Sequence, residues 1–114
     1  MTVRSILITG CSSGIGYACA QGMRARGWRV FASCRKQADC DRLIAKGFDA
    51  PLLDYADEST ITSALDTVLA ATGGRLDVLF NNGAFALPGA VEDLPTDGLR
   101  SIFETNVFGW HTLT

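Results

Sequence analysis

Short apolar runs alternate with amphipathic segments along the whole chain. The apolar runs predict buried strands, and the segments between them predict helices with one apolar face. The expected strands are residues 3–9, 28–33, 50–53 and 76–80, and the expected helices are residues 14–26, 38–46, 58–71 and 96–114. Strands that alternate with helices in this way are typical of βαβ units. We therefore expect an α/β fold built on a parallel sheet.

The predicted helices are bounded by residues that commonly end helices. Gly27, Gly47 and the pair Gly73-Gly74 each follow one of them, and glycine is the preferred residue just beyond a helix C-terminus. Residues 81–94 carry neither pattern and predict a loop. No repeat, low-complexity tract or linker interrupts the 114 residues, so we expect a single domain with its own core.

The last predicted helix keeps an apolar face up to the end of the sequence. The face consists of Ile102, Phe103, Val107, Trp110 and Leu113, and no glycine, asparagine or cationic turn closes the helix. A face this apolar requires a surface to pack against. A frayed terminal helix is one interpretation. The interpretation we favour is that the chain is part of a longer one.

Composition narrows the classes of function. The hydrophobic fraction of 47% and the slightly positive mean hydropathy suit a globular chain with some apolar surface left for a partner. A net charge of −2 gives no reason to expect nucleic acid or an anionic membrane as a partner. The sequence has no apolar run of about 18 residues and opens directly on a motif, which predicts a cytoplasmic protein without a signal peptide.

The cysteines do not have the spacing of a metal site. None of Cys11, Cys19, Cys34 and Cys40 forms a C-x-x-C pair, and the single histidine, His111, is distant in sequence. We therefore expect reduced thiols and no bound metal. Cys11 is of interest because it lies in a loop that is expected to contact a cofactor.

The strongest motif is the octet T-G-C-S-S-G-I-G at residues 9–16, between the first predicted strand and the first predicted helix. A pyrophosphate needs backbone N–H groups at close range and the positive end of a helix dipole behind them. Gly10 allows a tight turn out of the strand, Gly14 lets a cofactor approach the backbone, and Gly16 lets the helix pack on the sheet. The motif and its position therefore predict a dinucleotide-binding loop.

This octet resembles the cofactor loop of the short-chain dehydrogenase/reductase family. Within that family it is most similar to the hydroxysteroid and retinol dehydrogenase branch and to related bacterial aldehyde and ketone reductases. Three further segments follow in the family's order: Leu53-Asp54, Asn81-Asn82-Gly83-Ala84 and Asn106-Val107-Phe108-Gly109. The resemblance implies a Rossmann-type parallel sheet with strand order 3-2-1-4 and helices on both faces.

The same resemblance implies a set of site residues. Asp54 would meet the adenine ring, and Asn106 would belong to the catalytic tetrad. The implied cofactor-binding residues are Gly10, Ser12, Ser13, Gly14, Ile15, Gly16, Asp54, Asn82, Gly83 and Ala84. One departure is the order Gly83-Ala84, since the family has alanine before glycine. A methyl group at residue 84 stands where a bare Cα is usual.

The end of the second predicted strand discriminates between NAD and NADP. An acid there would accept hydrogen bonds from the ribose hydroxyls and repel a 2′-phosphate. The strand instead leads into Arg35 and Lys36, and the nearest acid is Asp39. The planar fork of Arg35 suits phosphate oxygens, Lys36 adds a second charge, and Ser13 can donate a hydroxyl. We expect NADP(H) as the cofactor, the alternative being that Arg35 and Lys36 are a solvated loop pair.

Family chemistry requires a tyrosine and a lysine four residues apart. Here Tyr17 is followed by Gln21 and Tyr55 by Ser59, so Asn106 is the only tetrad member present. We interpret residues 1–114 as the NADP(H)-binding half of an oxidoreductase, inactive alone, whose catalytic half lies outside this sequence. A non-catalytic NADP(H)-binding module or redox sensor is the alternative.

The substrate is only weakly indicated by the sequence. Phe85, Leu87 and Pro88 predict an apolar wall, which favours an aldehyde, a ketone or a hydrophobic alcohol, but they equally suit plain packing. For the complete protein we expect a small carbonyl or alcohol substrate and a homo-oligomer, either a dimer or a tetramer.

Overall fold

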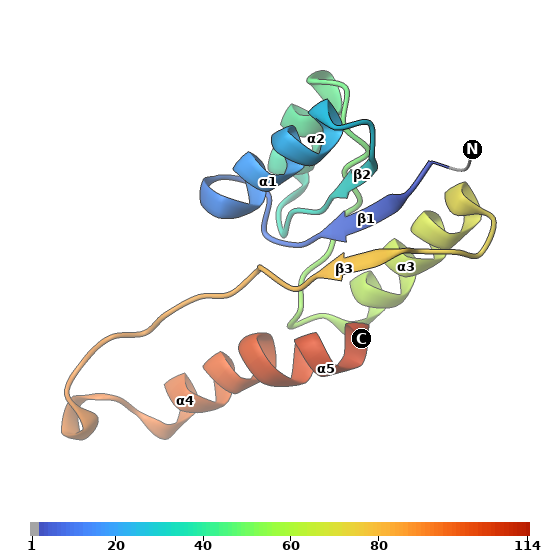
Figure 1. The fold of residues 1–114 in the computed structure, drawn as a ribbon. Helices are drawn as coiled ribbons and strands as arrows, with labels where there is room; N and C mark the ends of the chain where they lie inside the picture. The colour runs from blue at the N-terminus through green and yellow to red at the C-terminus, as the bar shows by residue number, and fades with distance from the viewer. Residues whose placement is uncertain (1–2) are drawn as a thin grey trace.

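The computed structural model describes residues 3–114 and contains a three-stranded parallel sheet with helices on both sides (Figure 1). β1 (Ser5–Ile8) is the central strand, and it pairs with β2 (Arg29–Ala32) on one edge and with β3 (Val78–Phe80) on the other. The predicted α/β fold with a parallel sheet is confirmed, and these three strands take their expected order.

The strand expected at residues 50–53 is only partly confirmed. Two isolated parallel bridges, Phe31 with Asp49 and Cys34 with Leu52, hold this segment at the outer edge of β2. The Ala32 N–H donates to the carbonyl oxygen of Asp49 at 2.8 Å. The next rung of a parallel ladder would need an N–H from residue 51, which is proline and has none. The segment therefore lies where the strand was expected without forming a continuous ladder.

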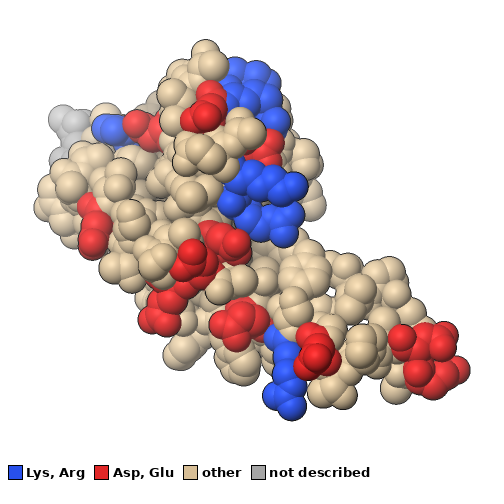
Figure 2. All heavy atoms as spheres, turned by 180° about the vertical axis from the view of Figure 1, so that it is seen from behind, with Lys and Arg blue, Asp and Glu red and all other residues tan. Residues whose placement is uncertain are grey.

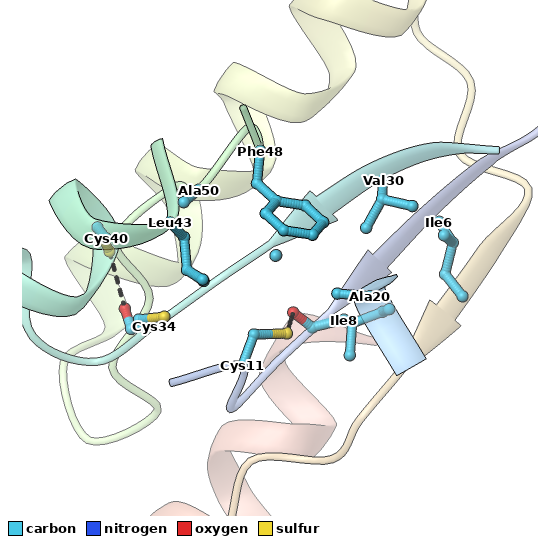
Figure 3. Packing of buried hydrophobic residues seen from close by; sticks show 11 residues of the cluster. Ile6, Ile8, Cys11, Ala20, Val30, Cys34, Cys40, Leu43, Phe48 and Ala50 are labelled. Carbon is cyan, nitrogen blue, oxygen red and sulfur yellow. Dashed lines mark hydrogen bonds between the residues drawn. The ribbon is translucent and has the colours of Figure 1, made fainter. Parts of the chain in front are cut away.

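Alternate residues of β1 face two separate apolar layers. Ile6 and Ile8 belong to the cluster that contains residues of α1 (Gly14–Ala25) and α2 (Gln37–Ala45), as Figure 3 shows. Leu7 belongs to the cluster on the opposite face, with residues of α3 (Glu58–Thr72) and α5 (Trp110–Leu113). Fully burying a side chain of this size contributes about 1.5–3 kcal/mol. The strand is thus buried on both faces, as its continuous apolar run predicts.

Residues 81–114 form an arm that extends from the sheet and returns to it (Figure 1). The loop is confirmed and contains a short 3₁₀ turn, η1 (Val91–Asp93). The single helix expected at residues 96–114 is instead α4 (Thr96–Phe103), a π-helix, η2 (Glu104–Gly109), and α5. Within residues 3–114, no helix combines the length and apolarity needed to cross a membrane.

The apolar face of this last helical segment is covered at one end only. Leu113 is buried in the core and Trp110 is half-buried against it. Phe103 and Val107 are each 44% exposed, and Phe108 beside them is 55% exposed. The expected need for a covering surface therefore applies to α4 and η2 but not to α5.

Candidate functional site

A cavity of about 370 Å³ lies where the predicted site residues converge. It is lined by Thr9, Gly10, Ser12, Ser13, Arg35, Lys36, Asp39, Leu53, Asp54, Tyr55, Asn82, Gly83, Ala84, Phe85 and Thr105. All the predicted cofactor residues are among them except Gly14, Ile15 and Gly16. The lining segments follow β1, β2 and β3 at their carboxyl ends, which is where open α/β sheets bind ligands.

The glycine loop leaves the start of α1 open. Gly14 has a positive φ of 63° and opens the helix, and a Cβ built on it would meet nothing within 4 Å. Ser13, at the N-cap, makes no side-chain hydrogen bond to the helix, and the first turn contains no acid. The first N–H groups of α1 therefore lack a side-chain acceptor, a geometry that suits an anion.

Gly16 makes close contacts that its position in the sequence does not reveal. The sequence predicts that it lets α1 pack on the sheet. A Cβ at Gly16 would overlap the carbonyl oxygen of Gly10 and would lie 2.7 Å from Nδ2 of Asn82. The absence of a side chain at Gly16 thus allows the glycine loop to fold back on its own helix and to meet the segment after β3.

Thr9 joins the glycine loop to that segment. Its Oγ1 accepts hydrogen bonds from the N–H groups of Asn82, at 2.9 Å, and Gly83, at 2.8 Å. The Asn82 side chain donates in return to the carbonyl oxygens of Thr9, at 3.1 Å, and Gly10, at 3.3 Å. A Cβ on Gly10 would lie only 2.7 Å from the Gly83 Cα, so the two backbones are in close contact.

The order Gly83-Ala84 fits this contact. A Cβ on Gly83 would lie 3.1 Å from Cε2 of Tyr55 and 3.3 Å from the backbone N of Gly10, so the smallest residue occupies the tightest place. Ala84 is exposed and lines the cavity. The indole Nε1–H of Trp110 donates to the Gly83 carbonyl oxygen at 2.7 Å, which fixes the peptide group between Gly83 and Ala84.

Tyr55 is a site residue that the sequence reasoning missed. Its hydroxyl donates to Oδ1 of Asn81 at 2.6 Å and lies 2.7 Å from Oγ1 of Thr9, and burial raises its pKa to about 12. The ring packs on Gly109, where a Cβ would overlap the Tyr55 Cβ. The only available signal was that Tyr55 directly follows the Leu53-Asp54 pair, and that signal does not reveal the contacts with distant residues.

We expect Tyr55→Phe to lower the free energy of unfolding by about 1–2 kcal/mol, because Thr9 and Asn81 would each lose a buried partner. Chemical denaturation of the full-length protein measures this. Tyr17→Phe is the control, since the Tyr17 hydroxyl makes exposed hydrogen bonds only and should change stability by less than about 0.5 kcal/mol. If both changes lower the free energy of unfolding equally, the hydrogen bonds of the buried Tyr55 hydroxyl do not stabilise the fold as expected.

Asn106 lies in η2 and is fully engaged with the loop after β3. Its Oδ1 accepts the Phe85 N–H at 3.1 Å, and its Nδ2 donates to the Phe85 carbonyl oxygen at 2.8 Å. The adjacent Thr105 lines the cavity, whereas Asn106 does not. Single-turn π-helices occur frequently at functional sites. The side chain thus holds the cavity wall at Phe85, and neither end of its amide is directed at the cavity.

Arg35, Lys36 and Ser13 line the same cavity, as the sequence predicts for a 2′-phosphate site. Figure 2 shows most of the visible basic side chains gathered on the part of the molecule that holds α1 and α2, with acidic side chains both among them and over the rest of that face. Asp39, from the first turn of α2, also lines the cavity. The sequence names Asp39 only as the nearest acid beyond the strand end, and the structure shows that the next helix brings it to the cavity.

The structure also places the other single residues that the sequence singles out. Cys11 does not face the cofactor cavity: it is fully buried in the core (Figure 3), its Sγ–H donates to the Ile8 carbonyl oxygen at 3.2 Å, and burial raises the pKa of its thiol. Of the three residues predicted to form an apolar wall, Phe85 lines the cavity, whereas Leu87 and Pro88 do not.

The arrangement defines an α/β protein with an anion-compatible cleft at the carboxyl edge of a parallel sheet. The family model described as short chain dehydrogenase matches residues 4–114. The chain therefore belongs to the short-chain dehydrogenase family.

Relatives and solved structures agree with this placement. The chain is 38% identical over 111 residues to the uncharacterized oxidoreductase YbbO of Escherichia coli, covering 97% of this chain and 41% of that protein. It is 34% identical over 116 residues to the NADPH-dependent 3-dehydrocapnine reductase of Ornithobacterium rhinotracheale, covering 98% and 41%. A short-chain dehydrogenase from Streptomyces avermitilis superposes with a TM-score of 0.89 at 37% identity, covering 99% and 42%. The chain thus spans about two-fifths of the length of these proteins.

Proposed function

We propose that the protein is an NADP(H)-dependent oxidoreductase that interconverts an alcohol and a carbonyl compound, and that residues 1–114 hold its cofactor. The observation that carries the proposal is the single cavity in which the open start of α1 meets Arg35 and Lys36. The backbone at the start of α1 suits a pyrophosphate, and Arg35 and Lys36 suit an additional phosphate. The similarity to an NADPH-dependent reductase supports the same choice of cofactor.

The lining residues would each contact a different part of the cofactor. The backbone at Ser12, Ser13 and Gly14, with Ile15 and Gly16 in the first turn of α1, would hold the pyrophosphate. Asp54 would meet the adenine ring, and Asn82, Gly83 and Ala84 would pass beside the second ribose. The bound nicotinamide would supply or accept a hydride. The open space at Gly14 supports this fit, because nothing within 4 Å blocks an approach to the backbone there.

Asn106 acts in this proposal as a positioning residue. Its double hydrogen bond to Phe85 fixes the cavity wall where a substrate carbonyl would approach the nicotinamide. A tyrosine acid/base with a neighbouring lysine would come from outside residues 1–114. The exposed apolar side chains of α4 and η2 support a homo-oligomer, either a dimer or a tetramer, or burial of this face by another part of a longer protein.

Arg35→Asp is expected to weaken NADP(H) binding by roughly 2–4 kcal/mol, because a charge-assisted contact is lost and a repulsion is gained. NAD(H) should be affected much less, since it carries no 2′-phosphate. Dissociation constants of both cofactors for wild type and variant measure the change. Arg26→Asp is the matched control, since the Arg26 side chain bonds within its own helix and does not line the cavity. An unchanged ratio of the two constants would mean that the phosphate lies elsewhere.

The non-catalytic alternative makes a different prediction for the full-length protein. A binding module or redox sensor would bind NADPH without oxidising it when small aldehydes and ketones are added. Burial of three of the four cysteines disfavours a thiol-based sensor, because oxidation requires exposed thiolates. Substrate-dependent loss of NADPH absorbance therefore separates the two functions.

A further inference from the structure

The acid in the cavity needs a physical explanation if the site is to hold a phosphate. Asp39 lines the same cavity as Arg35 and Lys36, and its side chain is 25% exposed. A carboxylate there would repel a 2′-phosphate and would accept hydrogen bonds from free ribose hydroxyls. By itself, Asp39 would therefore favour NAD(H) over NADP(H).

Arg42, one turn further along α2, neutralises this acid. Its Nη1 donates to Oδ1 of Asp39 at 2.7 Å, and its Nη2 donates to the carbonyl oxygen of Ser12 at 2.7 Å. The guanidinium thus bridges the carboxylate and the glycine loop, which lies 30 residues earlier in the chain. Arginine suits this place because its planar fork can hold two acceptors at once.

The bond to Ser12 also orients the glycine loop. The peptide group that contains the Ser12 carbonyl also contains the Ser13 N–H, and in a trans peptide these two groups point in opposite directions. When Arg42 holds the carbonyl oxygen on the α2 side, the Ser13 N–H is turned away from α2. Ser13 lines the cavity at the open start of α1, so the orientation of this N–H matters for any anion bound there.

We propose that Arg42 is a positioning and specificity-determining residue: it cancels the charge of Asp39 at the 2′-phosphate end of the cavity and holds the Ser12–Ser13 peptide in its anion-binding orientation. This inference rests on the proposed function. The first effect acts mainly on NADP(H), because only that cofactor carries the phosphate that Asp39 would repel. The second acts on both cofactors, because both carry the pyrophosphate.

The test uses Arg42→Gln, Asp39→Asn and the double variant in the full-length protein, with dissociation constants for NADPH and NADH from fluorescence titration. Arg42→Gln should weaken NADPH binding about tenfold and NADH binding about twofold, which lowers the preference for NADPH about fivefold. Asp39→Asn should raise that preference about twofold. In the double variant the preference should return close to wild type, because no unpaired carboxylate is left.

Arg24→Gln is the matched control. Arg24 also donates from Nη1 to a distant backbone carbonyl, that of Lys46 at 2.9 Å, but it does not line the cavity. This change should leave the ratio of the NADPH and NADH constants as in wild type. Salt gives a further readout, because it screens charges. Raising the ionic strength should reduce the effect of Arg42→Gln on the NADPH dissociation constant. The smaller effect on the NADH dissociation constant should change less.

The outcomes separate the inference from the function on which it rests. Wild-type protein that binds neither cofactor would overturn the proposed function and this inference together. Wild type that prefers NADPH while Arg42→Gln keeps the same preference would overturn the inference alone. If Arg42→Gln does not fold, Asp39→Asn decides, since an unchanged preference in that variant would mean that the Asp39 charge does not act on the phosphate.

Discussion

Gly16→Ala is expected to lower the free energy of unfolding by about 3 kcal/mol and to abolish NADP(H) binding. The new Cβ would overlap the carbonyl oxygen of Gly10 and lie 2.7 Å from Nδ2 of Asn82. Overpacking commonly costs about 1–3 kcal/mol. The upper end applies because the nearer obstacle is the Gly10 backbone and the Asn82 amide is held by hydrogen bonds to the carbonyl oxygens of Thr9 and Gly10. The displaced Gly10 and Asn82 belong to the proposed cofactor cavity, so binding should fail together with stability.

Gly22→Ala is the matched control, since both glycines lie in α1. A Cβ at Gly22 would meet only the mobile guanidinium of Arg26, at 3.3 Å. Alanine is also the better helix former by about 0.5–1 kcal/mol, so this variant should be as stable as wild type or more stable. Denaturation midpoints and NADPH dissociation constants of the full-length variants measure both effects. Gly16→Ala with wild-type stability and binding would show that the loop is not held as the structure has it.

The elements were predictable from local patterns because each depends on residues close in sequence. The apolar run of β1 and the glycine that ends α3 gave the right element at nearly the right place. The segment at residues 50–53 also reads as a strand locally, and it lies at the expected edge of β2. Its ladder fails because of one missing N–H at Pro51, an effect that depends on the register with β2 and not on apolarity.

The last helical segment also could not be predicted fully from its local sequence pattern. Its 3.6-residue periodicity predicts one continuous α-helix, but the chain changes to a π-helix at residues 104–109. This change coincides with the two hydrogen bonds from Asn106 to Phe85 and with the packing of Tyr55 against Gly109. The partner positions lie 21 and 54 residues away in the sequence, so no local pattern could reveal them.

The candidate site was predictable where a residue belongs to a motif, and not where it acts through distant contacts. The predicted residues Ser13, Arg35 and Asp54 all line the cavity. Tyr55 and Arg42 were missed, and Asp39 was noted only as an acid beyond the strand end, because their importance appears only when segments far apart in sequence meet. Arg42 reads locally as half of an exposed i,i+3 ion pair with Asp39, and nothing in that spacing indicates the hydrogen bond to Ser12.

A protein made of residues 1–114 alone is expected to show no dehydrogenase activity, a loss of at least about 10²–10⁴-fold relative to the full-length enzyme. Hydride transfer to a carbonyl produces an alkoxide that must be protonated, and the reverse reaction requires removal of the alcohol proton. A positioned acid/base supplies that proton transfer, and in this family it is a tyrosine beside a lysine. The two tyrosines of the chain each lack one part of this arrangement.

Tyr55 is in the cavity but has no charged partner. Its hydroxyl bonds to Thr9 and Asn81, and burial raises its pKa to about 12, away from the neutral range in which an acid/base works best. Tyr17 has a neighbouring lysine, since Nζ of Lys46 donates to its hydroxyl at 3.2 Å. Neither residue lines the cavity. Asn106 cannot substitute for either, because an amide does not titrate near neutrality.

The comparison requires that the short chain binds its cofactor, so that inactivity is not mistaken for unfolding. Intact mass and light scattering establish that the sample is 114 residues long and establish its assembly state, and NADPH titration establishes binding. The exposed Phe103, Val107 and Phe108 make association or aggregation an expected complication, which detergent-free size exclusion would reveal.

With binding established, NADPH absorbance is followed with a panel of aldehydes and ketones. A monodisperse 114-residue monomer that oxidises NADPH in a substrate-dependent way would overturn the prediction, because Tyr17, Tyr55 or Asn106 would then have to carry a proton transfer that their surroundings do not support.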